Sequence, residues 1–208
     1  KAMADTIGAK TGDLGLFISG PWQKAYSVLG LLRLEMANRL NLIPDGKWNF
    51  LWVTDFPLLE FDEGEKRYVA VHHPFTSPKP EDLPLLESDP GKAKARAYDL
   101  VLNGTELAGG SIRIHDSELQ SKMFSLMGIG AEEARLKFGF MLDAFKYGAP
   151  PHGGIAYGFD RLIMLMTGQK SIRDVIAFPK TASAVSLMDD CPSAVDKKQL
   201  DELHIRVV

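Results

Sequence analysis

The chain has 208 residues, enough for about one to one and a half average domains, because a domain takes roughly 100–200 residues. Its hydrophobic fraction of 45% and charged fraction of 25% exclude a disordered, collagen-like or coiled-coil protein, and no apolar run approaches the ~20 residues of a membrane span. The net charge of −3 argues against a whole-surface nucleic-acid binder, while the single cysteine, Cys191, excludes a disulfide framework or a multi-cysteine zinc site and indicates a reducing compartment.

Residues 1–44 are expected to form the end of a small α/β module. The chain opens without a start methionine or a signal peptide, so we expect it to be a piece of a longer protein. Residues 13–19 predict a short strand, and the apolar residues between 25 and 40 recur at spacings that predict an amphipathic helix after Pro21. The turn residues at 43–46 place the joint to a second domain at about residue 44.

Residues 45–208 carry the pattern of an antiparallel sheet with flanking helices. Strands are expected at 50–59 (interrupted by Pro57), 68–72, 97–102, 105–115 and 153–157. Helices are expected at 117–126 (with Ser117 as N-cap), 131–147 and 159–167. Strands and helices do not alternate in a βαβ rhythm, and Asn103-Gly104 predicts a type I′ hairpin, so the predicted fold class is α+β.

The predicted hairpin places two acidic residues on one face. A two-residue turn pairs Val101 with Glu106, and Asp99 lies two residues before Val101. The two carboxylates are then diagonal neighbours, roughly 7–8 Å apart at the backbone. Oxygen ligands on such a face suit Mg²⁺. The alternative is a pair of solvated strand carboxylates.

The second strand of this hairpin requires a change in its side-chain alternation. Leu107 and Ile112 are both expected to face the core, yet they are an odd number of positions apart, so we expect a β-bulge at Gly109-Gly110. The bulge adds to the acidic face Ser111, Arg113 and His115. An arginine on a rigid strand suits bidentate binding of a carboxylate or phosphate. The alternative is an ion pair with the glutamate of the same hairpin.

A pair of histidines, His72-His73, precedes Pro74. Adjacent strand residues face opposite ways, and no cysteine or third histidine is near them in the sequence. A contact to substrate, or a structural pair, is therefore favoured over zinc binding.

Near the C-terminus, residues 153–161 run from a short strand through Gly158 into a helix. The amide groups at the start of a helix form a natural phosphate site, and Arg161 lies on the first turn. The Gly-Lys-Ser/Thr ending of a P-loop is absent.

A series of segments resembles class II aminoacyl-tRNA synthetases, specifically those of the bacterial aspartyl type. These segments are Phe56-Pro57, His72-His73-Pro74-Phe75-Thr76, Ala97-Tyr98-Asp99-Leu100-Val101-Leu102-Asn103-Gly104, Gly109-Gly110-Ser111-Ile112-Arg113-Ile114-His115, Phe138-Gly139-Phe140, Tyr147-Gly148-Ala149-Pro150-Pro151-His152-Gly153-Gly154, Gly158-Phe159-Asp160-Arg161 and Ile172-Arg173-Asp174-Val175-Ile176-Ala177-Phe178-Pro179-Lys180. The resemblance implies that residues 1–44 end the bacterial insertion (GAD-type) domain. It also implies that residues 45–208 are the C-terminal part of the catalytic domain, with motif 3 at 153–168.

The resemblance implies that the whole enzyme joins L-aspartate to ATP, releasing pyrophosphate, and then transfers the aspartyl group to tRNA. The attacking group is already a carboxylate, so the site needs positioning and charge neutralisation more than an acid or a base. By resemblance, Arg113, Glu106 and Arg161 act in catalysis; aspartate contacts Arg113, Ser111, His72 and His73; Mg²⁺ binds Asp99 and Glu106; and ATP contacts Glu106, Gly158, Phe159, Asp160 and Arg161.

The departures from the family pattern limit what we expect of this chain alone. Motifs 1 and 2 and the anticodon-binding domain have no counterpart in the sequence, so the piece alone is expected to be inactive, and the whole enzyme to be a cytoplasmic homodimer. One alternative is an ammonia-dependent asparagine synthetase, which residues 1–44 disfavour. Another is a synthetase-like binding protein without the chemistry, which the charged residues Asp99, Glu106, Arg113 and Arg161 disfavour.

Overall fold

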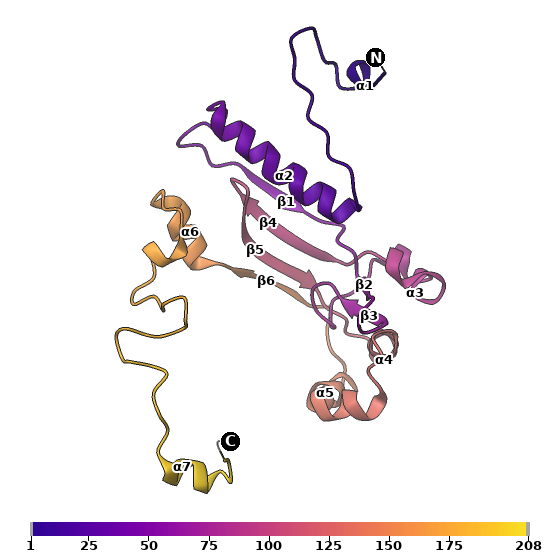
Figure 1. Ribbon diagram of the computed structural model, residues 1–208. Helices are drawn as coiled ribbons and strands as arrows, with labels where there is room; N and C mark the ends of the chain where they lie inside the picture. Colours follow the sequence, from indigo (N-terminus) through magenta and orange to yellow (C-terminus); the bar gives the residue numbers. More distant parts are fainter. Residues whose placement is uncertain (1, 207–208) are drawn as a thin grey trace. The chain divides into compact units, whose positions relative to one another are not determined.

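The computed structural model describes residues 2–206, and the chain divides into two compact units between Trp48 and Asn49 (Figure 1). The first unit contains the helices α1 (Ala2–Thr6) and α2 (Trp22–Arg39). The predicted helix after Pro21 is confirmed. The predicted strand at 13–19 is wrong: the segment has no partner strand among the described residues of its unit, and Leu14 and Phe17 are 80% and 63% exposed.

The second unit is built on a four-stranded antiparallel sheet of order β1-β4-β5-β6. Its strands are β1 (Phe50–Val53), β4 (Ala97–Leu102), β5 (Thr105–Ile112) and β6 (Gly153–Tyr157). Asn103 and Gly104 have φ angles of 49° and 81°, both positive as a type I′ turn requires. The antiparallel sheet and the α+β class are therefore confirmed.

The single strand expected at 50–59 is instead divided between two sheets. After β1, Asp55 takes a φ of 63° and Pro57 lacks the N–H group that a central strand position needs. The chain then enters a separate hairpin of β2 (Leu59–Asp62) and β3 (Arg67–Ala70).

The second unit also contains helices, as expected. They are α3 (Leu85–Ser88), α4 (Ser117–Leu126), α5 (Ala131–Phe145), α6 (Phe159–Met166) and α7 (Lys197–Glu202), with 3-10 turns η1 (Pro80–Asp82), η2 (Pro90–Lys92) and η3 (Ile172–Asp174). The N-cap of α4 is Asp116 and not Ser117, because an Asp116 carboxylate oxygen accepts a hydrogen bond from the Leu119 N–H at 2.7 Å. None of the helices among residues 2–206 combines the length and the apolar character that crossing a membrane demands.

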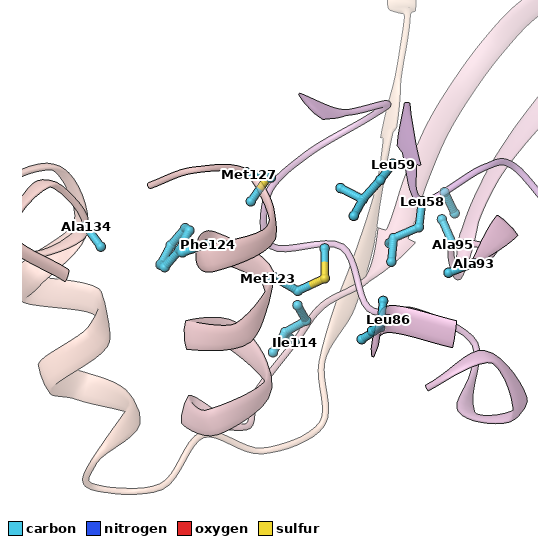
Figure 2. Packing of buried hydrophobic residues seen from close by; sticks show 11 residues of the cluster. Leu58, Leu59, Leu86, Ala93, Ala95, Ile114, Met123, Phe124, Met127 and Ala134 are labelled. Carbon is cyan, nitrogen blue, oxygen red and sulfur yellow. The ribbon is translucent and has the colours of Figure 1, made fainter. Parts of the chain in front are cut away.

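The main hydrophobic core lies between α4, the β2–β3 hairpin and the segments around residues 86–95. Figure 2 shows Met123 of α4 close to Ile114, and Phe124 extending towards Ala134 of α5. Burying a large apolar side chain of this kind contributes about 1.5–3 kcal/mol. Ile114 follows directly after β5 and Arg113, so the core fixes the end of the strand that carries the candidate site residues.

Candidate active site

A β-bulge in β5 arranges the polar face of the hairpin. Val101 pairs with Glu106 and Leu100 pairs with Ala108, so Leu107 is the extra residue. The expected bulge at Gly109-Gly110 is therefore wrong in position. Leu107 and Ala108 are only 3% and 2% exposed, because the bulge allows two consecutive apolar side chains to be buried.

The two glycines make room on opposite faces of the sheet. Gly109 pairs with Asp99, and a Cβ at Gly109 would lie 2.7 Å from Asp99 Oδ1 and 3.7 Å from Glu106 Oε1. A Cβ at Gly110 would lie 2.8 Å from Cε2 of Tyr98, whose hydroxyl donates a hydrogen bond to the Gly154 carbonyl at 3.0 Å. The missing side chain at Gly109 thus leaves a cradle between the two carboxylates.

Asp99 and Glu106 form the acidic half of the site. Asp99 is half-buried, and its pKa is raised first by burial and then by the negative charge of Glu106, while His72 acts in the opposite direction. The His72 ring packs edge-on against Phe56 at a centroid distance of 4.6 Å. Two carboxylates that repel each other across an open cradle suit a divalent cation. The described residues contain no group of three or more acidic, histidine or cysteine side chains placed to hold a metal.

Arg113 and His73 form the basic half of the site. Arg113 Nη1 is buried and makes no hydrogen bond within the described structure. The pKa of His73 is lowered first by partial burial and then by the charge of Arg113, which favours the neutral ring. His73 Nδ1 accepts a hydrogen bond from the Phe75 N–H at 3.3 Å. An unpaired guanidinium nitrogen is a ready donor to a carboxylate.

This basic half opens onto a cavity of about 350 Å³, lined by His73, Phe75, Arg113, Ile114, Met141, Phe145 and His152. The apolar residues of this set come from the core and from α5. His152, which the sequence did not point to, also accepts a backbone hydrogen bond from the Arg113 N–H at 2.9 Å. Its only sequence signal is its place between Pro150-Pro151 and Gly153-Gly154.

Arg161 joins the start of α6 to the acidic half. Its Nη1 donates a hydrogen bond to the Glu106 carbonyl at 2.8 Å and lies 3.5 Å from Glu106 Oε1. The expected alternative, an ion pair between Arg113 and Glu106, is therefore wrong, because Arg161 takes that place. The Gly158 N–H donates to the Leu107 carbonyl at 2.8 Å, which attaches the glycine turn to the bulge. Phe159 and Asp160 are exposed beside it.

Two residues of the expected polar face are placed differently from the others. Ser111 is 3% exposed, and its hydroxyl accepts a hydrogen bond from the Thr76 hydroxyl at 3.4 Å. Thr76, which sequence reasoning missed, also pairs with Arg113 in an isolated β-bridge. His115 is exposed beyond the end of β5. The structure thus gathers His72, Asp99, Glu106 and Arg161 in one half and His73 and Arg113 in the other.

Comparisons with known proteins identify the family of the chain. A family model described as tRNA synthetases class II (D, K and N) matches residues 22–182. Because that range is more than half of the chain, the chain belongs to the class II tRNA synthetases.

Individual relatives are more specific. The chain is 63% identical over 203 residues to a protein of Caldanaerobacter subterraneus named aspartate–tRNA(Asp/Asn) ligase, covering 98% of this chain and 34% of the relative. It is 62% identical over 203 residues to the aspartate–tRNA ligase of Staphylococcus carnosus, with the same coverage of 98% and 34%. The chain therefore spans about a third of the length of these relatives.

Among solved structures, the aspartyl-tRNA synthetase of Entamoeba histolytica is similar in fold. The TM-score is 0.51 at 24% sequence identity, and the match covers 89% of this chain and 30% of that one.

Proposed function

We propose that this chain is the C-terminal part of the catalytic domain of an aspartate–tRNA ligase, which activates L-aspartate with ATP and transfers the aspartyl group to tRNA. The observation that carries the proposal is the buried, unpaired Nη1 of Arg113 beside His73. A carboxylate is the ligand that best satisfies a guanidinium in this setting. The relatives at 62–63% identity bear the name of the same activity.

In this proposal Arg113 binds the side-chain carboxylate of aspartate. His72 and His73 bracket the amino acid, and His73 in its neutral form with Nδ1 occupied keeps Nε2–H free to donate a hydrogen bond. Ser111 stabilises the basic half indirectly, because its buried hydroxyl accepts a hydrogen bond from Thr76. These groups hold the reacting α-carboxylate of aspartate in place, because an anionic nucleophile needs orientation more than a base.

The acidic half serves ATP. Asp99 and Glu106 would hold Mg²⁺, and the cradle at Gly109 fits such an ion. The ion would neutralise phosphate charge and retain several of its waters, as is usual when only one or two carboxylates bind it. Arg161 and the first-turn amides of Phe159 and Asp160 supply further positive charge for the phosphates, next to Gly158, whose own N–H is bonded to the Leu107 carbonyl.

Further features of the whole protein belong to the same proposal. Residues 1–44 would end an insertion domain, and residues 45–208 would complete the catalytic domain. The whole enzyme would be a cytoplasmic homodimer that binds tRNA mainly through parts outside this chain. The relatives include proteins named aspartate–tRNA(Asp/Asn) ligase and others named simply aspartate–tRNA ligase, so charging assays should include both tRNA(Asp) and tRNA(Asn).

The test is aspartate-dependent exchange of radiolabelled pyrophosphate into ATP. A longer protein that contains this chain should exchange, and the 208-residue chain alone should not. Exchange by itself does not exclude an asparagine synthetase, which also forms aspartyl-adenylate, so charging of tRNA is measured alongside it. Failure of the longer protein to charge tRNA, together with formation of free asparagine from aspartate, ATP and ammonia, would refute the proposal. A protein that binds ATP and performs neither reaction would refute it as well.

A further inference from the structure

One polar side chain of the core has no place in the function described so far. Gln120 lies on α4, 0% exposed, on the same helix face as the core residues Met123 and Phe124. Its Nε2 donates a hydrogen bond to the Pro74 carbonyl at 3.0 Å. Its Oε1 is buried and has no partner within the described structure. Retaining an unsatisfied acceptor in a core is unfavourable, and such groups need an explanation.

The carbonyl that Gln120 holds belongs to the segment that carries both histidines of the site. Downstream of Pro74 this segment is already well fixed. The Phe75 ring packs edge-on against Phe124 at 5.7 Å and Phe138 at 5.1 Å, and its carbonyl accepts a hydrogen bond from the Ile114 N–H at 2.9 Å. Thr76 then pairs with Arg113.

Upstream of Pro74 the side chains are more open to solvent, and His72 and His73 are both exposed. The Phe56 ring packs against His72. His73 is held by hydrogen bonds from the Phe75 N–H to its Nδ1 and from the Thr76 N–H to its carbonyl at 3.0 Å, and its ring lies 5.1 Å from that of Phe75. The Gln120 amide adds a hydrogen bond to the carbonyl of Pro74, the residue directly after His73. It therefore restrains the peptide on which the orientation of both imidazoles depends.

We infer that Gln120 is a positioning residue for amino-acid binding. By binding the Pro74 carbonyl, Gln120 fixes the backbone that places His73 near Arg113 and His72 near Asp99. The positions of the basic and acidic halves relative to each other are thereby maintained. The inference rests on the proposed function, because its readout is aspartate binding. This role also explains the unpaired Oε1. The Gln120 side chain is retained because its Nε2 donates the hydrogen bond, and the Oε1 of the same amide has no partner as a consequence.

The decisive variant is Gln120→Met, which has a similar volume and no polar atoms, tested in a longer protein that contains this chain. The substitution removes the unpaired oxygen, which favours the folded state, but it also leaves the Pro74 carbonyl without its donor, which disfavours it. Because the two effects oppose each other, we expect the Tm to change little. The KM for aspartate in pyrophosphate exchange should rise by about 10- to 100-fold, the scale of a small misplacement of binding groups. The KM for ATP should stay within about twofold of its value in the unsubstituted protein.

Two further variants sharpen the test. Met123→Leu changes the core on the same face of α4 without touching Pro74, and should leave the KM for aspartate unchanged. Gln120→Glu can donate to the Pro74 carbonyl only when its carboxyl group is protonated. The aspartate KM of Gln120→Glu, divided by that of Gln120→Met at the same pH, should therefore decrease as the pH falls.

The outcomes are distinguishable. Lack of exchange by the unsubstituted protein refutes the proposed function. Exchange by that protein together with an unchanged aspartate KM in Gln120→Met overturns the role of Gln120 alone. A Gln120→Met protein that unfolds, or loses Tm with no change in KM, also overturns it, because the role would then be structural.

Discussion

Replacement of Arg113 by lysine is the sharpest test of the basic half of the site. Arg113 Nη1 is buried without a hydrogen-bond partner, and Arg113 lines the cavity beside His73 and His152. A lysine keeps the positive charge but replaces the planar fork by a single point donor. Arg113→Lys therefore removes one of the two hydrogen bonds that a bound carboxylate would receive.

The size of the effect follows from that loss. A hydrogen bond to a charged group contributes about 1.5–3 kcal/mol, and each 1.4 kcal/mol corresponds to about a tenfold change in affinity. The KM for aspartate should rise by about 10- to 150-fold. The KM for ATP should change little, because Arg161 and the acidic half remain intact. The Tm should not fall, because the substitution removes the buried Arg113 Nη1, which has no hydrogen-bond partner, together with the rest of the guanidinium group.

The assay is pyrophosphate exchange at varied aspartate concentration, with Arg135→Lys as the matched control. The Arg135 side chain is 71% exposed on α5, and its contact with Asp143 is a long 3.5 Å, so the control should behave as the unsubstituted protein. An aspartate KM that is the same in both variants would refute the assignment of Arg113.

Three other predictions concern the same site. Glu106→Gln should raise the Mg²⁺ concentration for half-maximal exchange by ~10-fold or more, the scale of a disturbed ligand shell; an unaltered magnesium titration would rule out a role in metal binding. Gly109→Ala should impair the magnesium dependence likewise, because the new Cβ would lie 2.7 Å from Asp99 Oδ1, whereas Gly154→Ala, where a Cβ meets nothing within 4 Å, should be neutral. The folded-state pKa of His73 lies below its ordinary 6.5, so its contribution to stability is present above pH 6.5 and is lost as the pH falls towards the folded-state pKa. Denaturant midpoints of the unsubstituted protein and His73→Gln should therefore converge on acidification, and parallel pH curves would contradict this.

Much of the second unit could be predicted from local sequence. The Asn103-Gly104 turn and the helical spacing before Gly148 are short-range signals, and both elements form where expected. The shared face of Asp99, Glu106 and Arg113 also follows from the alternation of side chains along a strand. One extra residue between Glu106 and Ile112 shifts all later side chains to the other face, wherever that extra residue lies.

The position of the bulge could not be predicted, because it depends on contacts distant in sequence. Leu107 is an ordinary strand residue whose carbonyl is paired by Gly158, about fifty positions later. The same holds for the Arg161–Glu106 contact, which no spacing rule encodes. The two glycines expected to mark the bulge instead leave space for neighbouring groups, each on its own face of the sheet.

The contact between Gly158 and the Leu107 carbonyl has a consequence for how this site can vary. Glu106 is covalently next to Leu107, and Arg161 lies one helical turn after Gly158, so the groups proposed for the cation and for the phosphates are separated by very little chain. The long segment from residue 113 to residue 152, which contains α4 and α5, begins after β5 and ends before β6. Insertions in the exposed connections of that segment should alter the amino-acid pocket, which α5 lines, and leave the spacing of the nucleotide groups unchanged. The two halves of the site can therefore diverge at different rates.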